Sequence, residues 1–278
     1  MPIFNGAQPL PRYIIECNRS INDIIKKPYM NAAFPAYQHM LSALTTAMIN
    51  TGIQQNQAFI LSQTEVLSHL HDIMRNAQPL IEAFIQQRIS AGEIHNADQA
   101  RKSIAGNLLQ QFVAYNLAKN VVDGIITKPV IVTMSVQNII NQYAAISVGN
   151  EIQKPDSDII VYSDSPSTPI LNISCKTSCR ERAGQTYKWK LLCDLATCNC
   201  IYKNGNPNCP STRYNLNYYP TKVIKMCFVT TDFYNELSHP QISGMFSFFD
   251  CSYVAKPVSS NNNVLPLHNI IQYINSIF

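Results

Sequence analysis

The chain has 278 residues, of which 46% are hydrophobic and 14% charged, and it carries a net charge of +4. It is long enough for one large core or two modest ones, and its composition is that of a soluble globular protein. Because no apolar run approaches the ~20 residues of a membrane span and no basic segment with an apolar stretch opens the sequence, we expect neither a membrane protein nor a secreted one.

Helical periodicity dominates the first hundred residues. Apolar side chains recur at three- and four-residue steps, which predicts one helix over about 37–50, another through 59–74, and a third that restarts after Gln78-Pro79 and reaches Ile89. Residues 1–100 are close to neutral, with 6 basic and 7 acidic side chains. We therefore expect residues 1–97 to form a helical N-terminal region, to which the sequence assigns no role.

Strand and helix patterns alternate in the remainder, residues 98–278. The expected elements are a helix over 98–122, a strand at 129–133, a helical segment over 135–147, strands at 159–162 and 170–175, a helix over 183–196, β-rich runs at 222–230 and 245–254, and a closing helix at 269–278. Helices that flank a mixed central sheet make this region an α/β (α+β) core.

Positive charge is concentrated in this second region. Residues 101–278 carry 15 basic and 10 acidic side chains. Five of the basic residues but only one acid lie within 176–190, where Tyr187 and Trp189 stand among them. Such a run is either a solvated face or a surface for a partner, and its position directly after a predicted strand favours the partner.

An acid and a lysine stand at the ends of two neighbouring predicted strands. Asp158 directly precedes Ile159, and Lys176 ends the strand that follows. Hydrolysis of a phosphodiester bond requires anionic oxygens that hold a divalent cation, and a cationic side chain beside the attacking water. Mg²⁺ takes only one or two carboxylates and keeps several waters. Asp158 and Asp156 are therefore candidate acids, and Lys176 is the candidate catalytic cation.

These residues resemble the active-site motif of the PD-(D/E)XK nuclease superfamily, in particular that of type II restriction endonucleases. Pro155-Asp156 supplies a literal Pro-Asp pair. The register nevertheless favours Asp158 as the metal-binding aspartate, because it stands directly before the hydrophobic strand residues, and Asp156 is the reserve. The resemblance covers about residues 100–195. It implies a nuclease core with a mixed sheet, a requirement for Mg²⁺, and Lys176 as the catalytic lysine.

The second half of the motif departs from the family pattern. The position two residues before the lysine, where the family has an acid, is Ser174. This Ser-Cys-Lys version is similar to the subgroup of enzymes that read CCGG- or CCNGG-type sites, in which the missing acid comes from another element. Three acids remain open as its replacement, namely Glu151, Glu181 and Asp194, and we take Glu151 as the second metal ligand.

A second family element is a helix whose glutamate reaches into the active site. The run from Ser103 through Gly106 to Gln110 resembles the start of that helix, with the amide of Gln110 in place of the carboxylate. An amide can orient a water molecule, although it brings no charge. The resemblance therefore implies a catalytic position for Gln110.

The tripeptide Arg180-Glu181-Arg182 is a candidate for reading DNA bases. A guanidinium can bind O6 and N7 of guanine together, and a carboxylate can accept from N4 of cytosine. The Lys-x-x-x-Arg-(Asp/Glu)-Arg spacing is similar to that of family members whose sites contain CC and GG steps. The alternative is that Glu181 only pairs with its neighbours at a helix start. We expect further contacts from Gln185 and Lys188, and phosphate contacts from Lys190, Lys203, Arg213 and Lys222.

Nine cysteines without a secretion signal indicate reduced thiols or metal ligands rather than disulfides. Four of them gather between residues 193 and 209, a spacing that differs from the paired Cys-x-x-Cys form. Two interpretations stay open, a structural Zn²⁺ site and thiols in a buried segment. The four candidate ligands are Cys193, Cys198, Cys200 and Cys209.

These features together predict a Mg²⁺-dependent type II restriction endonuclease that cleaves double-stranded DNA at a short site containing G·C steps. The resemblance implies a prokaryotic, cytoplasmic enzyme, and a symmetric site favours a homodimer. Two alternatives stay open at this point. One is another nuclease of the same fold, such as a repair or nicking enzyme, and the other is a DNA-binding protein with a decayed active site.

Overall fold

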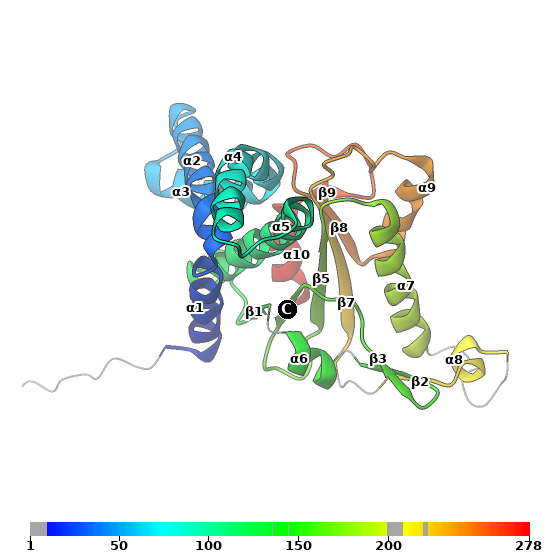
Figure 1. Cartoon of the computed structure of the whole chain (residues 1–278). Helices are drawn as coiled ribbons and strands as arrows, with labels where there is room; N and C mark the ends of the chain where they lie inside the picture. Colours follow the sequence, from blue (N-terminus) through cyan, green and yellow to red (C-terminus); the bar gives the residue numbers. More distant parts are fainter. Residues whose placement is uncertain (1–9, 135, 144, 199–207, 219–221) are drawn as a thin grey trace, which may run out of the picture.

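The computed structural model describes residues 10–134, 136–143, 145–198, 208–218 and 222–278. Figure 1 shows a cluster of N-terminal helices beside a central sheet, with further helices on both faces of that sheet. The expected α/β core with a helical N-terminal region is confirmed. Within the described ranges, no helix combines the length and the hydropathy that crossing a bilayer requires.

The N-terminal part is built from five α-helices and one short 3-10 turn. The sequence did not predict the first helix, and it predicted too late a start for the second. The helix restart expected at Pro79 is also wrong, because one helix runs unbroken through this residue. The bounds are α1 (Arg12–Ile25), α2 (Pro28–Asn50), α3 (Gln55–Glu65), η1 (Val66–His69), α4 (Leu70–Ser90) and α5 (Ala97–Val122).

Helix α5 matches its sequence prediction closely. Asn96 caps its first turn by accepting the backbone N–H of Gln99 at 2.9 Å. Gly124 follows its last turn with a φ of +74°, a left-handed conformation that glycine adopts without strain. Between these two ends, α5 packs against α1, α4 and the sheet, so it connects the N-terminal helices with the core.

Six strands form the main sheet, in the order β1-β4-β5-β7-β8-β9. Their bounds are β1 (Ile131–Thr133), β4 (Ile159–Tyr162), β5 (Ile170–Lys176), β7 (Ile224–Thr230), β8 (Cys251–Val254) and β9 (Leu265–Pro266). The pairs β1–β4 and β4–β5 are antiparallel, whereas β5, β7, β8 and β9 are mutually parallel. The sheet is therefore mixed, as expected.

A second, smaller sheet and several short helices complete the described part of the chain. The small sheet has the order β3-β2-β6, with β2 (Ile146–Val148), β3 (Glu151–Gln153) and β6 (Leu216–Tyr218). The remaining helices are α6 (Val136–Tyr143), α7 (Arg180–Ala196), α8 (Pro210–Arg213), α9 (Pro240–Ser243), the 3-10 helix η2 (Gly244–Phe248) and α10 (Asn269–Ile277). The β-rich run expected over 245–254 is wrong in its first half, which forms η2.

Alternation along the strands divides the buried side chains into two cores. Leu171 and Ile173 of β5 face one cluster, which also contains residues of α5 and α10. Ile170 faces the other cluster, which lies under α7. Because successive side chains of a strand point to opposite faces, Ser174 and Lys176 share the α7 face. The first cluster continues into the N-terminal helices, and the domain boundary at residues 97/98 stays a prediction.

Candidate active site

Asp158 and Lys176 converge at one end of the main sheet. The backbone N–H of Asp158 donates to the carbonyl of Ile173 at 3.1 Å, which continues the β4–β5 ladder by one residue. Lys176 is the last residue of β5. Its Nζ lies 3.0 Å from Oδ2 of Asp158 and 2.8 Å from Oδ2 of Asp156. The expected juxtaposition of these side chains is thus present.

Three donors contact the two carboxylates, and Lys176 is one of them. The Asp158 Oδ2 also accepts the backbone N–H of Cys175 at 2.7 Å, and its Oδ1 accepts Nε2 of Gln110 at 2.7 Å. The structure therefore brings Gln110 of α5 to the same carboxylate, as the resemblance implied. An amide nitrogen that donates to Asp158 leaves the carbonyl oxygen of Gln110 free to act as an acceptor.

Burial and charge act in opposite directions on this cluster. The side chains of Asp158 and Lys176 are only 12% and 8% exposed, whereas Asp156 is 37% exposed. Burial raises the pKa of Asp158 above its usual value, although the Lys176 charge and the Cys175 N–H oppose the shift. Burial alone would lower the pKa of Lys176, but the charges of Asp158 and Asp156 outweigh it and raise this pKa. Lys176 is therefore an ammonium ion at neutral pH.

An open cavity of about 520 Å³ lies over these groups. Two side chains of α7 reach it, Gln185 and, four residues later, Trp189, because residues four apart lie on one face of a helix. Lys154 also lines the cavity. The sequence predicted Gln185 as a DNA contact, whereas Lys154 and Trp189 were not predicted as site residues. The sequence could have indicated Trp189 through its four-residue spacing from Gln185 on a predicted helix. It could have indicated Lys154 through its closeness to Asp156 in the chain.

The acid that would replace Ser174 is not among the expected candidates whose side chains the structure describes. Ser174 is buried and lies 3.4 Å from the hydroxyl of Thr186 on α7. Glu151 is exposed on β3 in the small sheet and contacts Gln153, and it does not line the cavity. Asp194 pairs with Lys190 near the far end of α7. Asp156 is the second carboxylate that lies beside Lys176.

The geometry agrees with a comparison against protein families. The family model of BsaWI restriction endonuclease type 2 matches residues 135–276, slightly more than half of the chain. The chain belongs to this family. It is therefore a type II restriction endonuclease, a site-specific deoxyribonuclease that acts on DNA. The match contains Asp156, Asp158 and Lys176, whereas Gln110 lies outside it. No curated protein matches the chain.

Restriction endonucleases generally use divalent metal ions. Among the described residues of this BsaWI-family enzyme, no three His, Cys, Asp or Glu side chains form a group that could hold a metal ion. Glu151 therefore forms no such group with Asp156 and Asp158. Of the four cysteines considered for zinc, Cys193, Cys198 and Cys209 form none either, and Cys200 lies outside the described residues.

Helix α7 of the endonuclease begins at the tripeptide expected to read bases. The side chains of Arg180, Glu181 and Arg182 lie outside the part of the chain that the structure describes. The backbone N–H of Cys179, directly before them, donates to Oε2 of buried Glu236 at 2.7 Å. This carboxylate at the start of α7 stabilises the first turn by satisfying an N–H that has no partner within the helix.

Two of the lysines expected on phosphates are buried, so that expectation is wrong for them. Lys222 is 4% exposed and donates to the carbonyls of Ser163 and Ser165, each at 2.6 Å. Lys190 is 9% exposed and pairs with Asp194 and Asp250. The endonuclease does expose Arg213 and Lys188, whose roles stay predictions, and Lys203 lies outside the described residues.

Proposed function

We propose that this endonuclease hydrolyses both strands of duplex DNA by Mg²⁺-dependent attack of water on phosphorus, at the cluster of Asp156, Asp158 and Lys176. The observation that carries the proposal is the convergence of Lys176 Nζ on both carboxylates, at 2.8 and 3.0 Å. Two anionic groups and one cation at an open cavity are the components that phosphodiester hydrolysis requires. Membership of a restriction endonuclease family supports the same reaction.

The donor set at this cluster fits Mg²⁺. The ion prefers carboxylate oxygens, binds through one or two of them and keeps several waters. Asp158 and Asp156 would hold it, since both carboxylates line the cavity and Asp156 is partly exposed. Once bound, Mg²⁺ polarises the scissile phosphate and lowers the pKa of the attacking water. Among the residues that the structure describes, no cysteine or histidine, which would favour zinc, lines this cavity.

The remaining groups act on the attacking water and on the charge that develops at phosphorus. Lys176 is charged at neutral pH, so it stabilises hydroxide and the phosphorane-like transition state rather than removing a proton. Gln110 fixes Asp158 through its amide nitrogen, and its carbonyl oxygen orients the water. The backbone N–H of Cys175 holds the second oxygen of Asp158 in place.

We further propose that Arg180, Glu181 and Arg182 read G·C pairs in the major groove, in a site of the CCGG or CCNGG type. They occupy the first turn of α7, whose later residues Gln185 and Trp189 line the catalytic cavity. Because one helix carries both the tripeptide and residues of the catalytic cavity, the tripeptide would read bases next to the scissile phosphate. A symmetric site would be bound by a homodimer, because the two-fold symmetry of the protein matches that of the DNA.

Replacing Arg182 with alanine is expected to weaken selectivity more than it weakens binding. Loss of one bidentate arginine–guanine contact costs about 1–3 kcal/mol of discrimination against the wrong base. The measurement is cleavage of the cognate site relative to sites changed by one base pair. Arg213→Ala, which alters an exposed arginine outside α7, serves as the control. Unchanged discrimination in the Arg182→Ala enzyme would contradict the assignment of the tripeptide.

Digestion of a sequenced plasmid in Mg²⁺ tests the function as a whole. We expect discrete fragments, whose ends, mapped by run-off sequencing, fall within one short G·C-containing sequence. Nicked circles alone would instead indicate the alternative nuclease of the same fold. Retarded but intact plasmid would indicate a DNA-binding protein without activity, and it would contradict the proposal.

A further inference from the structure

Two hollows extend from the catalytic cavity along the boundary between the helical region and the sheet. The first, of about 680 Å³, shares Gln110 and Lys176 with the catalytic cavity. The second, of about 560 Å³, shares Phe233 and Tyr234 with the first. The three hollows are thus neighbours, and each is separated from the next by the side chains that both share. We call the two outer ones the flanking groove, which is lined in part by Arg75, Gln78, Arg101, Lys102, Phe233 and Tyr234.

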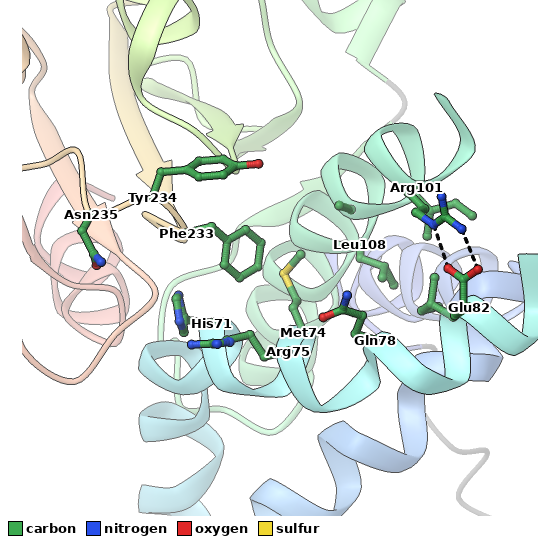
Figure 2. Close-up of a pocket in the computed structure, with 13 residues that line it drawn as sticks. His71, Met74, Arg75, Gln78, Glu82, Arg101, Leu108, Phe233, Tyr234 and Asn235 are labelled. Atoms are coloured by element: carbon green, nitrogen blue, oxygen red, sulfur yellow. Dashed lines mark hydrogen bonds and ion pairs between the residues drawn. The ribbon is translucent and has the colours of Figure 1, made fainter. Parts of the chain in front are cut away.

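Cationic side chains of helices α4 and α5 line this groove. Arg75 of α4 and Lys102 of α5 are both exposed, and neither forms an ion pair with any described residue. Arg101 differs from them, because it binds Glu82 through hydrogen bonds of 2.7 and 2.8 Å and also contacts Asp98 (Figure 2). The uncompensated positive charge of the groove is therefore that of Arg75 and Lys102.

The opposite wall is the turn that follows β7. Tyr234 is 68% exposed on this turn. Two residues that flank it, Asp232 and Asn235, have φ values of 49° and 54°, which are unusual for residues other than glycine. Buried Asp232 holds the turn together, since its carboxylate accepts from the backbone N–H of Glu236 at 2.6 Å and from Lys256 at 3.2 Å. The exposed ring is thus presented by a fixed backbone.

Phe233 joins the turn to the helical region. Figure 2 shows its ring directed toward Met74 of α4, with His71 close by. The ring centroids of Phe233 and His71 are 5.0 Å apart, and Nδ1 of His71 lies 2.9 Å from the carbonyl oxygen of Thr231. These contacts hold both walls of the flanking groove at a fixed separation, so the groove is part of the folded protein.

We propose that the flanking groove binds the duplex beside the cut, with Arg75 and Lys102 on phosphates and Tyr234 against the sugar-phosphate backbone. The inference rests on the proposed function, because the groove begins at the catalytic cavity. Arginine, lysine and tyrosine are among the side chains that contact DNA phosphates, and such contacts position a protein without reading sequence. The helical region thereby acquires a role, namely holding the DNA that leads to the active site.

The test compares two duplexes that contain the site mapped by plasmid digestion. One ends at the site, and the other extends about one helical turn, ~10 bp, beyond it on each side. Binding is measured with divalent ions chelated, over a series of salt concentrations. The variants are Tyr234→Ala and the double variant Arg75→Ala/Lys102→Ala, and Lys26→Ala/Lys27→Ala is the control that removes two exposed lysines outside the groove.

We expect both groove variants to bind the long duplex on the order of tenfold more weakly than wild type, and the short duplex equally well. The double variant should also lower the slope of log affinity against log salt by about 4, since each protomer of the proposed homodimer loses two phosphate contacts and each contact contributes about one unit. Equal affinity for the long duplex, or equal loss on both duplexes, would overturn the groove assignment while leaving cleavage intact. A wild-type protein that neither binds nor cuts duplex DNA would overturn the proposed function itself.

Discussion

Lys176→Met is expected to reduce the cleavage rate by ~10³-fold or more, because it removes the ammonium that contacts both carboxylates and stabilises the attacking hydroxide. Methionine keeps much of the length and apolar volume of the lysine stem, so the 8%-exposed position stays filled. DNA affinity should change by less than about tenfold, since at most one phosphate contact is lost. Single-turnover cleavage and filter binding of the same duplex measure the two effects separately.

Lys225→Met provides the matched control for this substitution. Lys225 lies on the adjacent strand β7, pairs with Asp250 at 3.0 Å, and stands opposite Leu171, far along β5 from Lys176. This control enzyme should cut at the wild-type rate. If the Lys176→Met enzyme cuts equally fast, the assignment of the active site is wrong, whatever happens to binding.

Asp158→Asn should lower the cleavage rate by a similar factor for a different reason. The substitution retains the shape of the side chain but removes the negative charge that would hold the divalent ion. Metal polarisation of the phosphate supplies several kcal/mol of transition-state stabilisation, and ~4 kcal/mol corresponds to ~10³-fold in rate. Gln110 and Lys176 both donate to the carboxylate of Asp158, so the amide nitrogen of the new asparagine would face one of these donors. We therefore expect the free energy of unfolding to fall by about 1–3 kcal/mol.

Asp250→Asn separates the catalytic loss from the loss of stability. Asp250 is 13% exposed, and it accepts from the backbone N–H of Met226 at 2.9 Å and from Lys225 at 3.0 Å, so its surroundings resemble those of Asp158. Thermal unfolding should show similar destabilisation for both variants, whereas only Asp158→Asn should stop cleavage. Loss of cleavage in both enzymes would indicate that destabilisation alone explains the effect.

The meeting of Asp158 and Lys176 could be predicted from the sequence because it depends on local pairing. The two residues belong to consecutive strands joined by a short turn, and consecutive strands of this kind pair antiparallel. Period-two alternation then puts both side chains on the α7 face. The placement of Gln110 needed the family resemblance, since 48 residues separate it from Asp158.

The two phosphate-binding lysines that proved buried show what residue type alone does not reveal. A lysine is exposed in most positions, so Lys222 and Lys190 were expected to reach DNA. Their burial depends on acceptors that come together only in the fold, the carbonyls of Ser163 and Ser165 for one and the carboxylates of Asp194 and Asp250 for the other. Only the pair Lys190–Asp194 has a sequence signal, since the two residues are four apart on a predicted helix.

The turn with Tyr234 and the run before β8 escaped prediction for a related reason. Left-handed backbone at Asp232 and Asn235 is stabilised by distant Lys256 and by Glu236, without any glycine to mark it. The aromatic run from Met245 resembles a strand, yet its first half forms η2, in which Phe246 is buried and packs on Phe228. In both cases tertiary contacts override the local preference of the sequence.

The position of Lys176 between Asp156 and Asp158 also determines the charge balance of the site when no divalent ion is bound. Neighbouring carboxylates repel each other, and the ammonium acts as an internal counterion that cancels this repulsion. The two carboxylates are therefore compensated by a group of the protein itself. On the proposed mechanism, a magnesium ion that binds Asp156 and Asp158 has to compete with this ammonium for the same oxygens, so cleavage would depend on the concentration of the ion.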